Sequence, residues 1–307
     1  MMKRRNQKQQ SRFRLLIQLM AAALFNGYFM GFAKGKIFTG ASKMACLPVL
    51  NCYSCPGALG SCPIGALQAV LGGNKHNFSF YVLGTIMLFG VVLGRLICGF
   101  LCPFGLVQDL LHRIPLPKLR VPRRIDKPLR YVKYLMLLLF VILMPIFLVN
   151  QFGIAPPYFC KWICPAGILE GAFPLVAKNE SIRAGLGFLF DWKLAVLILV
   201  LLASIFIYRP FCKYLCPLGG FYGLFNRFAF YRLYVDKSLC VNCKQCERHC
   251  PMQVEVLKDI NSAECIRCGK CKSICPTQAI QGGFLKKTPV SEKSSKYDDF
   301  SKPKNDL

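Results

Sequence analysis

One cysteine spacing, present twice near the end of the chain, constrains the fold more than any other feature. The pattern C-x2-C-x2-C-x3-C-P runs from Cys240 to Pro251 and again from Cys265 to Pro276. Three close cysteines can wrap one side of a four-iron cube, and in two-cluster proteins the fourth ligand comes from the other copy. We therefore expect two [4Fe–4S] clusters, the first held by Cys240, Cys243, Cys246 and Cys275 and the second by Cys265, Cys268, Cys271 and Cys250. A pair of zinc sites is the alternative, since four thiolates also bind zinc.

The remainder of the chain is apolar and basic. Of its 307 residues 54% are hydrophobic and 18% charged, and the formal net charge is +26. Four apolar stretches approach the roughly 20 residues that a membrane-spanning helix needs, at about 13–33, 80–100, 131–149 and 192–208. Because Lys and Arg concentrate in cytoplasmic segments, the basic residues before the first stretch and between the second and third predict a multi-pass cell-membrane protein with both termini in the cytoplasm. No nucleic-acid recognition motif accompanies the charge, so nucleic acid is not an expected partner.

The membrane part contains an internal repeat. Residues 95–113 align without gaps with residues 209–227, and both copies keep Arg, Cys-x3-Cys-Pro and Gly at the same positions. Each copy ends a predicted span. This predicts an α-helical membrane protein with four transmembrane helices in two pseudo-symmetric hairpins, followed by a small C-terminal α+β ferredoxin-like domain.

The repeat also suggests a third cluster. Two cysteines four residues apart lie on one face of a helix, and two such pairs supply four thiolates: Cys98, Cys102, Cys212 and Cys216. The alternative is that they are buried packing residues. Arg95 and Arg209 begin the two copies near the ends of spans, where extension of the side chain to the membrane interface is the expected role. Support of a negatively charged cluster is the alternative role.

Six more cysteines lie in the two loops predicted to face outward. Segments SCPIGALQ at Ser61 and ICPAGILE at Ile163 resemble each other faintly. A further cluster or disulfides could use the cysteines of these loops: Cys52, Cys55, Cys62, Cys160 and Cys164. Cys46 is set apart and is expected to be left out.

Four regions follow along the chain. We expect a basic cytoplasmic N-terminus at 1–12, a membrane domain at 13–232, the two-cluster domain at 233–282 and a disordered tail at 283–307. The three histidines include no C-x-x-C-H, so covalent haem is not expected. The sequence contains no recognisable nucleotide-binding or hydrolytic motif.

The set of motifs resembles the NapH/NosR-type membrane polyferredoxins, and residues 233–282 resemble the bacterial two-[4Fe–4S] ferredoxin domain. The resemblance implies a carrier that passes single electrons between a cytoplasmic or quinone donor and a membrane or extracytoplasmic partner. Membrane lipid, a redox partner protein, quinone and a partner's flavin are the implied contacts. The chain is expected to be a component of a redox complex rather than a catalyst. A maturation or sensing protein controlled by cluster state, and a metal-handling protein, are the alternatives.

Overall fold

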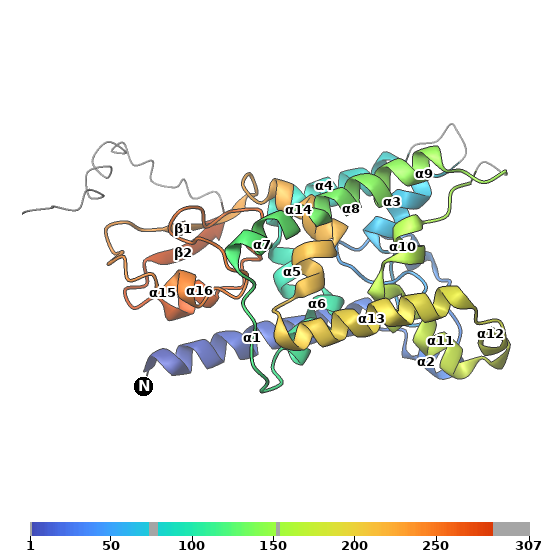
Figure 1. Ribbon diagram of the computed structural model, residues 1–307, viewed down its shortest axis with the longest axis horizontal. Helices are drawn as coiled ribbons and strands as arrows, with labels where there is room; N and C mark the ends of the chain where they lie inside the picture. The colour runs from blue at the N-terminus through green and yellow to red at the C-terminus, as the bar shows by residue number, and fades with distance from the viewer. Residues whose placement is uncertain (1, 74–78, 152–153, 285–307) are drawn as a thin grey trace, which may run out of the picture.

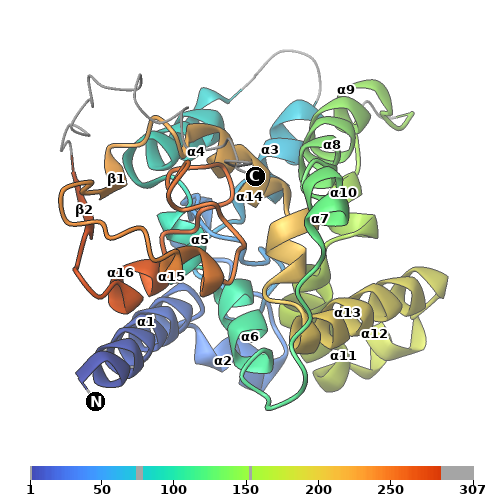
Figure 2. The ribbon, with the colours of Figure 1, turned by 60° about the vertical axis from the view of Figure 1, so that its left-hand side comes forward.

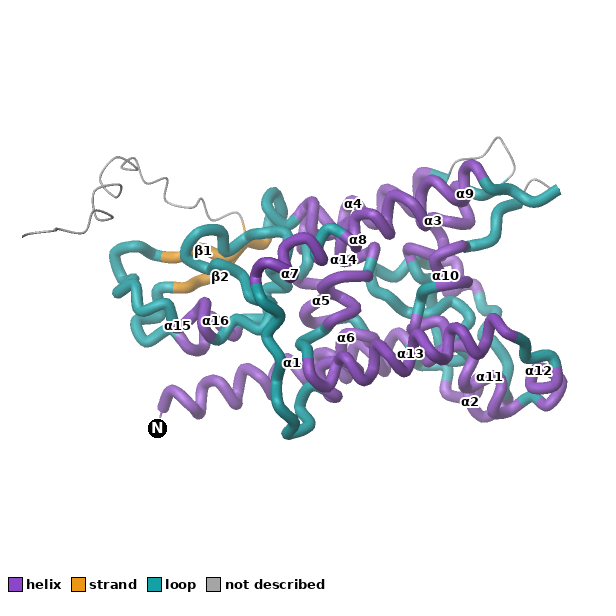
Figure 3. The backbone as a smooth tube through the Cα atoms, in the orientation of Figure 1, coloured by secondary structure: helices purple, strands orange, loops and turns teal. Residues whose placement is uncertain are grey.

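A computed structural model describes residues 2–73, 79–151 and 154–284 of the chain. Helices dominate these residues, and the two strands lie together at one end of the elongated molecule (Figure 3). The predicted tail at 283–307 lies outside the described residues except for its first two positions.

The helices form a bundle joined to a small C-terminal domain (Figure 1). Those before the first copy of the repeat are α1 Met2–Phe25, α2 Phe29–Lys34, η1 Ala41–Met44, α3 Pro63–Leu71 and α4 Phe80–Leu93. Those from the first copy through the loop that contains Cys160 and Cys164 are α5 Leu96–Phe100, α6 Pro103–Leu111, α7 Arg123–Leu129, α8 Val132–Met136, η2 Leu137–Leu143, α9 Met144–Phe147, α10 Tyr158–Trp162 and η3 Gly167–Ala172. The remainder of the bundle is α11 Phe173–Lys178, α12 Glu180–Ala184, α13 Phe188–Phe206, η4 Phe211–Leu215 and α14 Pro217–Phe225.

Two helices among the described residues are long and apolar enough to cross a membrane. One is α13, and the other is the continuous helix Arg123–Phe147, made of α7, α8, η2 and α9. They cover most of the third and fourth predicted spans, 131–149 and 192–208, and each ends two residues before its predicted limit. Helix α4, in the second predicted span, is apolar but shorter.

The first two predicted spans are interrupted. In the first, α1 ends at Phe25, and α2 starts after a turn in which Asn26 bonds back to the Ala22 carbonyl. In the second, Gly94 separates α4 from α5 with a φ of 52°, a conformation that glycine adopts without steric cost. A side chain at Gly94 would also meet Asn226 and Arg267.

The C-terminal domain contains one two-stranded antiparallel sheet and two short helices. Strand β1 Tyr231–Val235 pairs with β2 Ile280–Phe284, with Leu233 opposite Gly282. Helices α15 Gln245–Arg248 and α16 Lys270–Ile274 complete the domain, and Leu233 and Ile280 are buried in its small core. Helix α1 runs beside α16, so its first residues lie at the same end of the molecule as this domain (Figure 2).

Candidate iron–sulfur sites

The structure brings the eight ferredoxin-motif cysteines together in the two sets that the spacing predicts. One pocket is lined by Cys240, Cys243, Cys246 and Cys275, and another by Cys250, Cys265, Cys268 and Cys271. In each set the fourth cysteine comes from the other copy. Among the described residues, no group of three or more His, Cys, Asp or Glu side chains has the geometry to hold a single metal ion. The donor set of four thiolates around a larger space fits a [4Fe–4S] cube.

The backbone of the two motifs is bent in the same way. Asn242 and Arg267, each just before the second cysteine of its motif, have φ of 50° and 52°. The residues just after that cysteine, Lys244 and Gly269, also have positive φ. Non-glycine residues adopt this region only at a steric cost. The chain therefore accepts strain in order to curl three cysteines around one point.

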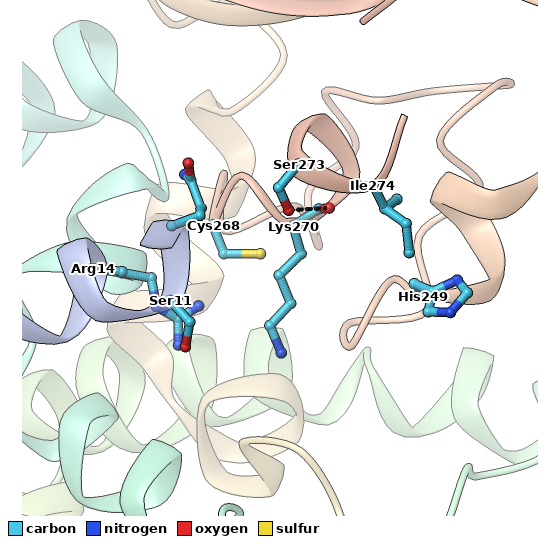
Figure 4. Close-up of a pocket in the computed structure, with 8 residues that line it drawn as sticks. Ser11, Arg14, His249, Cys268, Lys270, Ser273 and Ile274 are labelled. Carbon is cyan, nitrogen blue, oxygen red and sulfur yellow. Dashed lines mark hydrogen bonds between the residues drawn. The ribbon is translucent and has the colours of Figure 1, made fainter. Parts of the chain in front are cut away.

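Basic side chains lie beside the second set. Cys268, Lys270 and Arg14 of α1 line a cavity between α1 and the C-terminal domain (Figure 4). Arg14 is 7% exposed, and one of its guanidinium nitrogens, Nη1, has no hydrogen-bond partner among the described residues. Positive charge next to a cysteine thiolate stabilises the negative charge that a cluster carries.

The four cysteines of the internal repeat converge inside the bundle. All four are buried and interact electrostatically with one another: Cys98, Cys102, Cys212 and Cys216. Cys102 and Cys216 precede α6 and α14, and each sulfur accepts a hydrogen bond of 3.4 Å from the glycine three residues later. Proline begins both helices, where its missing N–H has no helical partner in any case. We call these four residues the inner group.

Two buried arginines brace the inner group reciprocally. Arg95, in the first copy, donates to the carbonyl oxygen of Cys212 in the second at 3.0 Å. Arg209, in the second copy, donates to the carbonyl oxygen of Cys98 in the first at 2.5 Å. Both arginines are 0% exposed, so the expectation that they reach the membrane interface is wrong. A buried guanidinium needs anionic or carbonyl partners, and here the other copy of the repeat supplies them.

The anionic partners of the arginines differ between the copies. Arg209 binds Asp109 through two nitrogens. Arg95 instead pairs with Glu264 of the C-terminal domain at 3.2 Å, and Lys133 pairs with the same carboxylate. Burial alone would raise the pKa of Glu264, but the charges of Arg95 and Lys133 outweigh it and hold this pKa below its ordinary value. The ionised carboxylate thus ties the C-terminal domain to the bundle.

The inner group and the second ferredoxin set meet at a backbone contact. A Cβ placed on Gly99 would lie 2.3 Å from the carbonyl oxygen of Ile266. Gly99 follows Cys98 directly, and Ile266 follows Cys265. Only the absence of a side chain lets these two cysteine-bearing segments touch.

The two loops that were predicted to face outward form a second convergent set. Cys52, Cys62, Cys160 and Cys164 interact electrostatically with one another. Cys62 precedes α3, and Cys164 precedes the helical turn that leads into η3. Each is followed by proline and then by a glycine whose backbone bonds the cysteine sulfur, as in the inner group. We call these four residues the outer group.

Hydrogen bonds from polar side chains join the two loops of the outer group. Gln68, from the first loop, donates to the sulfur of Cys160 at 3.4 Å, and Glu170, from the second loop, accepts from the backbone of Cys52 at 2.8 Å. Gln68 and Glu170 occupy matching positions in the two faintly similar segments. Asn51 is 0% exposed, and its side-chain amide has no partner among the described residues. The backbone of Asn51 bonds the sulfur of Cys62, and an unpartnered buried amide at this position fits an inorganic group that offers sulfur acceptors.

The remaining two cysteines differ from the outer group. Cys55 lies near Cys52 but turns its sulfur to the side-chain oxygen of Asn26, at 3.4 Å. Cys46 is buried, and its backbone pairs with Ser61. All eighteen cysteines are free thiols in the structure.

Several of these features were not predicted from the sequence. The motif Cys-Pro-x-Gly occurs four times, at Cys62, Cys102, Cys164 and Cys216, and it marks both groups. Asp109, Glu264 and Asn51 carried no recognisable signal, because isolated polar residues acquire a role only from partners distant in sequence.

Comparison with known proteins identifies the class. A 4Fe–4S binding domain model matches residues 76–122, 133–182 and 191–233, and a second matches residues 233–254 and 258–281. The fold and its cysteine groups therefore define a 4Fe–4S binding protein in both the bundle and the C-terminal domain. No solved structure matches the chain.

Similar proteins identify the family. An uncharacterized protein of Methanocaldococcus jannaschii is 31% identical over 66% of this chain and 69% of its own length. The ferredoxin-type protein NapH of Haemophilus influenzae is 28% identical over 56% of this chain and 53% of its own length. The regulatory protein NosR of Stutzerimonas stutzeri is 26% identical over 56% of this chain and 22% of its own length. The chain belongs to the NapH/NosR-type polyferredoxins.

Proposed function

We propose that the chain is a membrane-bound relay for single electrons, with four iron–sulfur sites in series. The two ferredoxin sets, the inner group and the outer group would each bind one [4Fe–4S] cluster. Bound clusters supply one-electron chemistry with little rearrangement. The observation that carries the proposal is the contact between Gly99 and Ile266, because it joins the C-terminal domain to the bundle at two proposed cluster sites.

A buried tyrosine supports continuity between the inner and outer groups. Tyr222 is 0% exposed and lies within electrostatic range of Cys98 and Cys102 of the inner group and of Cys62 of the outer group. Its hydroxyl donates to the carbonyl of Pro48 at 3.0 Å, which restrains the side chain. The protein's own contribution to a relay is to hold successive sites close and away from water.

Exposed apolar side chains on all four predicted spans support the placement of the bundle in a membrane. Long contiguous apolar surfaces are rare on soluble monomers. Here they occur on helices from each segment: Leu16, Met20 and Leu24 on α1, Tyr81 and Leu88 on α4, Leu135 and Leu138 in the Arg123–Phe147 helix, and Ile198, Leu199 and Leu202 on α13. We propose four membrane-crossing segments, a cytoplasmic C-terminal domain and a cytoplasmic start of α1, with domain limits near 12, 232 and 282.

The partners follow from this placement. We propose a cytoplasmic or quinone donor at one face and a membrane or extracytoplasmic redox protein at the other, with quinone or a partner's flavin as contact groups. The names of the relatives favour one competing role: NosR is a regulatory protein, so cluster state could control expression or assembly here. Sustained turnover separates the two, because a relay is reduced and reoxidised repeatedly whereas a sensor needs only one change of state.

Iron and acid-labile sulfide counts on anaerobically purified protein test the four sites. Four [4Fe–4S] clusters give about sixteen irons per chain. The pairs Cys98→Ala/Cys212→Ala and Cys62→Ala/Cys164→Ala should each remove about four. About eight irons, unchanged in both variants, would confine the clusters to the ferredoxin domain and contradict the relay.

A further inference from the structure

Exposure singles out one cysteine of the proposed relay. All eighteen cysteines lie among the described residues, and seventeen are buried or partly buried; Cys243 is the only exposed one. It belongs to the first ferredoxin set, in the domain that forms one end of the molecule (Figure 1). Electron exchange with another protein requires close approach, so Cys243 marks the part of the proposed relay that a partner can reach.

The surface around Cys243 is apolar at its centre. Val241 is 64% exposed and Leu239 is 45% exposed, on the loop that carries Cys240 and Cys243. Leu239 also lines a broad groove between α1 and the C-terminal domain, which continues past Cys275 and Phe13. A contiguous exposed apolar patch next to a cofactor site is typical of a protein-binding surface.

Basic side chains flank this apolar centre. Lys244 and Arg248 are exposed and one helical turn apart, so they lie on the same side. Arg120, from the bundle, donates to the Arg248 carbonyl at 2.5 Å and adds to the positive charge. The one acidic residue between 237 and 249, Glu247, accepts a hydrogen bond from the backbone of Leu257.

We propose that this surface, defined by Leu239, Val241, Cys243, Lys244 and Arg248, docks a soluble electron-transfer protein with an acidic contact face. The proposal rests on the proposed function and names its cytoplasmic partner class. An apolar centre with a charged rim matches the anatomy of protein interfaces, and the positive rim steers an acidic partner toward Cys243. One protein loses a single electron as the other gains it, and no bond forms or breaks.

The test measures association, using the full chain in neutral-lipid nanodiscs and a strongly acidic two-[4Fe–4S] bacterial ferredoxin as the probe. The variant Lys244→Glu/Arg248→Glu reverses the rim. Its matched control, Lys36→Glu/Lys178→Glu, makes the same charge change at two exposed lysines near α2 and α11, at the other end of the molecule. A further variant, Leu239→Ser/Val241→Ser, removes the apolar centre while keeping the charge.

We expect the rim variant to slow association about tenfold at low salt, with the difference fading as salt screens the charges. The apolar variant should accelerate dissociation, and the control should match the wild type. Three results would each overturn the proposal: a rim variant within twofold of its control, equal association of a basic cytochrome c probe, or a rim variant whose defect is confined to binding anionic lipid vesicles.

Iron counts on the same preparations keep the two proposals separate. If the wild type carries about sixteen irons and the acidic probe associates equally fast with the wild type and the rim variant, the docking surface alone is refuted. A wild type with about eight irons that still binds the acidic probe through the rim refutes the four-site relay and leaves the docking surface standing.

Discussion

The guanidinium of Arg95 forms an ion pair with the carboxylate of Glu264 at 3.2 Å, across 169 positions of sequence. The arginine starts the first copy of the bundle repeat, and the glutamate stands directly before the second ferredoxin motif. The same arginine holds the Cys212 carbonyl. One side chain therefore links the inner group to the C-terminal domain.

Glu264→Gln should destabilise the docked C-terminal domain strongly. It leaves Arg95 and Lys133, both 0% exposed, without their shared anion, and removal of one member of a buried pair typically costs about 3–5 kcal/mol. Denaturant unfolding followed by loss of cluster absorbance measures this. The control is Glu255→Gln, which breaks the solvent-exposed pair with Arg123 and should cost about 0–1 kcal/mol. Equal losses in both variants would contradict the bracing role of Glu264.

Gly99→Ala should separate two proposed cluster sites without emptying either. The new methyl group would lie 2.3 Å from the Ile266 carbonyl oxygen, so one backbone segment must move by about 1 Å to reach an ordinary contact. Iron content should hold, while magnetic interaction between clusters in the EPR spectrum of the reduced protein weakens. Gly84→Ala is the control, because nothing lies within 4 Å of a Cβ there. An unchanged spectrum in Gly99→Ala would argue against this junction.

Single cysteine variants should separate cluster ligands from other cysteines in the two loops that were predicted to face outward. Cys62→Ala should lose about four irons, because Cys62 belongs to the convergent outer group. Cys46→Ala and Cys55→Ala should keep the full count, since Cys55 turns toward Asn26 and the backbone of Cys46 pairs with Ser61, so that neither belongs to the outer group. Iron analysis decides this, and loss of iron in Cys55→Ala but not in Cys62→Ala would reassign the ligands.

Lys270→Gln should lower the reduction potential of the second ferredoxin cluster. The lysine carries positive charge near Cys268, and its removal disfavours the more negative reduced state. Because the lysine is exposed to screening solvent, we expect a shift of roughly 10–50 mV, below the 59 mV of a tenfold change for one electron. An EPR-monitored redox titration measures it, with the distant Lys178→Gln as control. A shift to higher potential would contradict the electrostatic account.

The local parts of this fold could be predicted from sequence. The two ferredoxin sets follow from spacing, and the inner group follows from the repeat, because both signals lie within short segments. The break at Gly94 could not be predicted from the apolar run at 80–100, since the segments that approach Gly94, at Asn226 and Arg267, are distant in sequence. The burial of Arg95 and Arg209 was missed for the same reason: their carbonyl and carboxylate partners come from distant segments. The membrane placement and the cluster ligands stay predictions.

Electron transfer across a vesicle membrane tests the relay most directly. The protein is reconstituted into liposomes that enclose ferricyanide, and dithionite is added outside, so that only a path through the membrane can bleach the enclosed oxidant. We expect rapid bleaching with the wild type, and with Cys62→Ala/Cys164→Ala a rate no faster than in protein-free vesicles. Wild-type protein that carries its full iron and bleaches no faster than empty vesicles would contradict the relay.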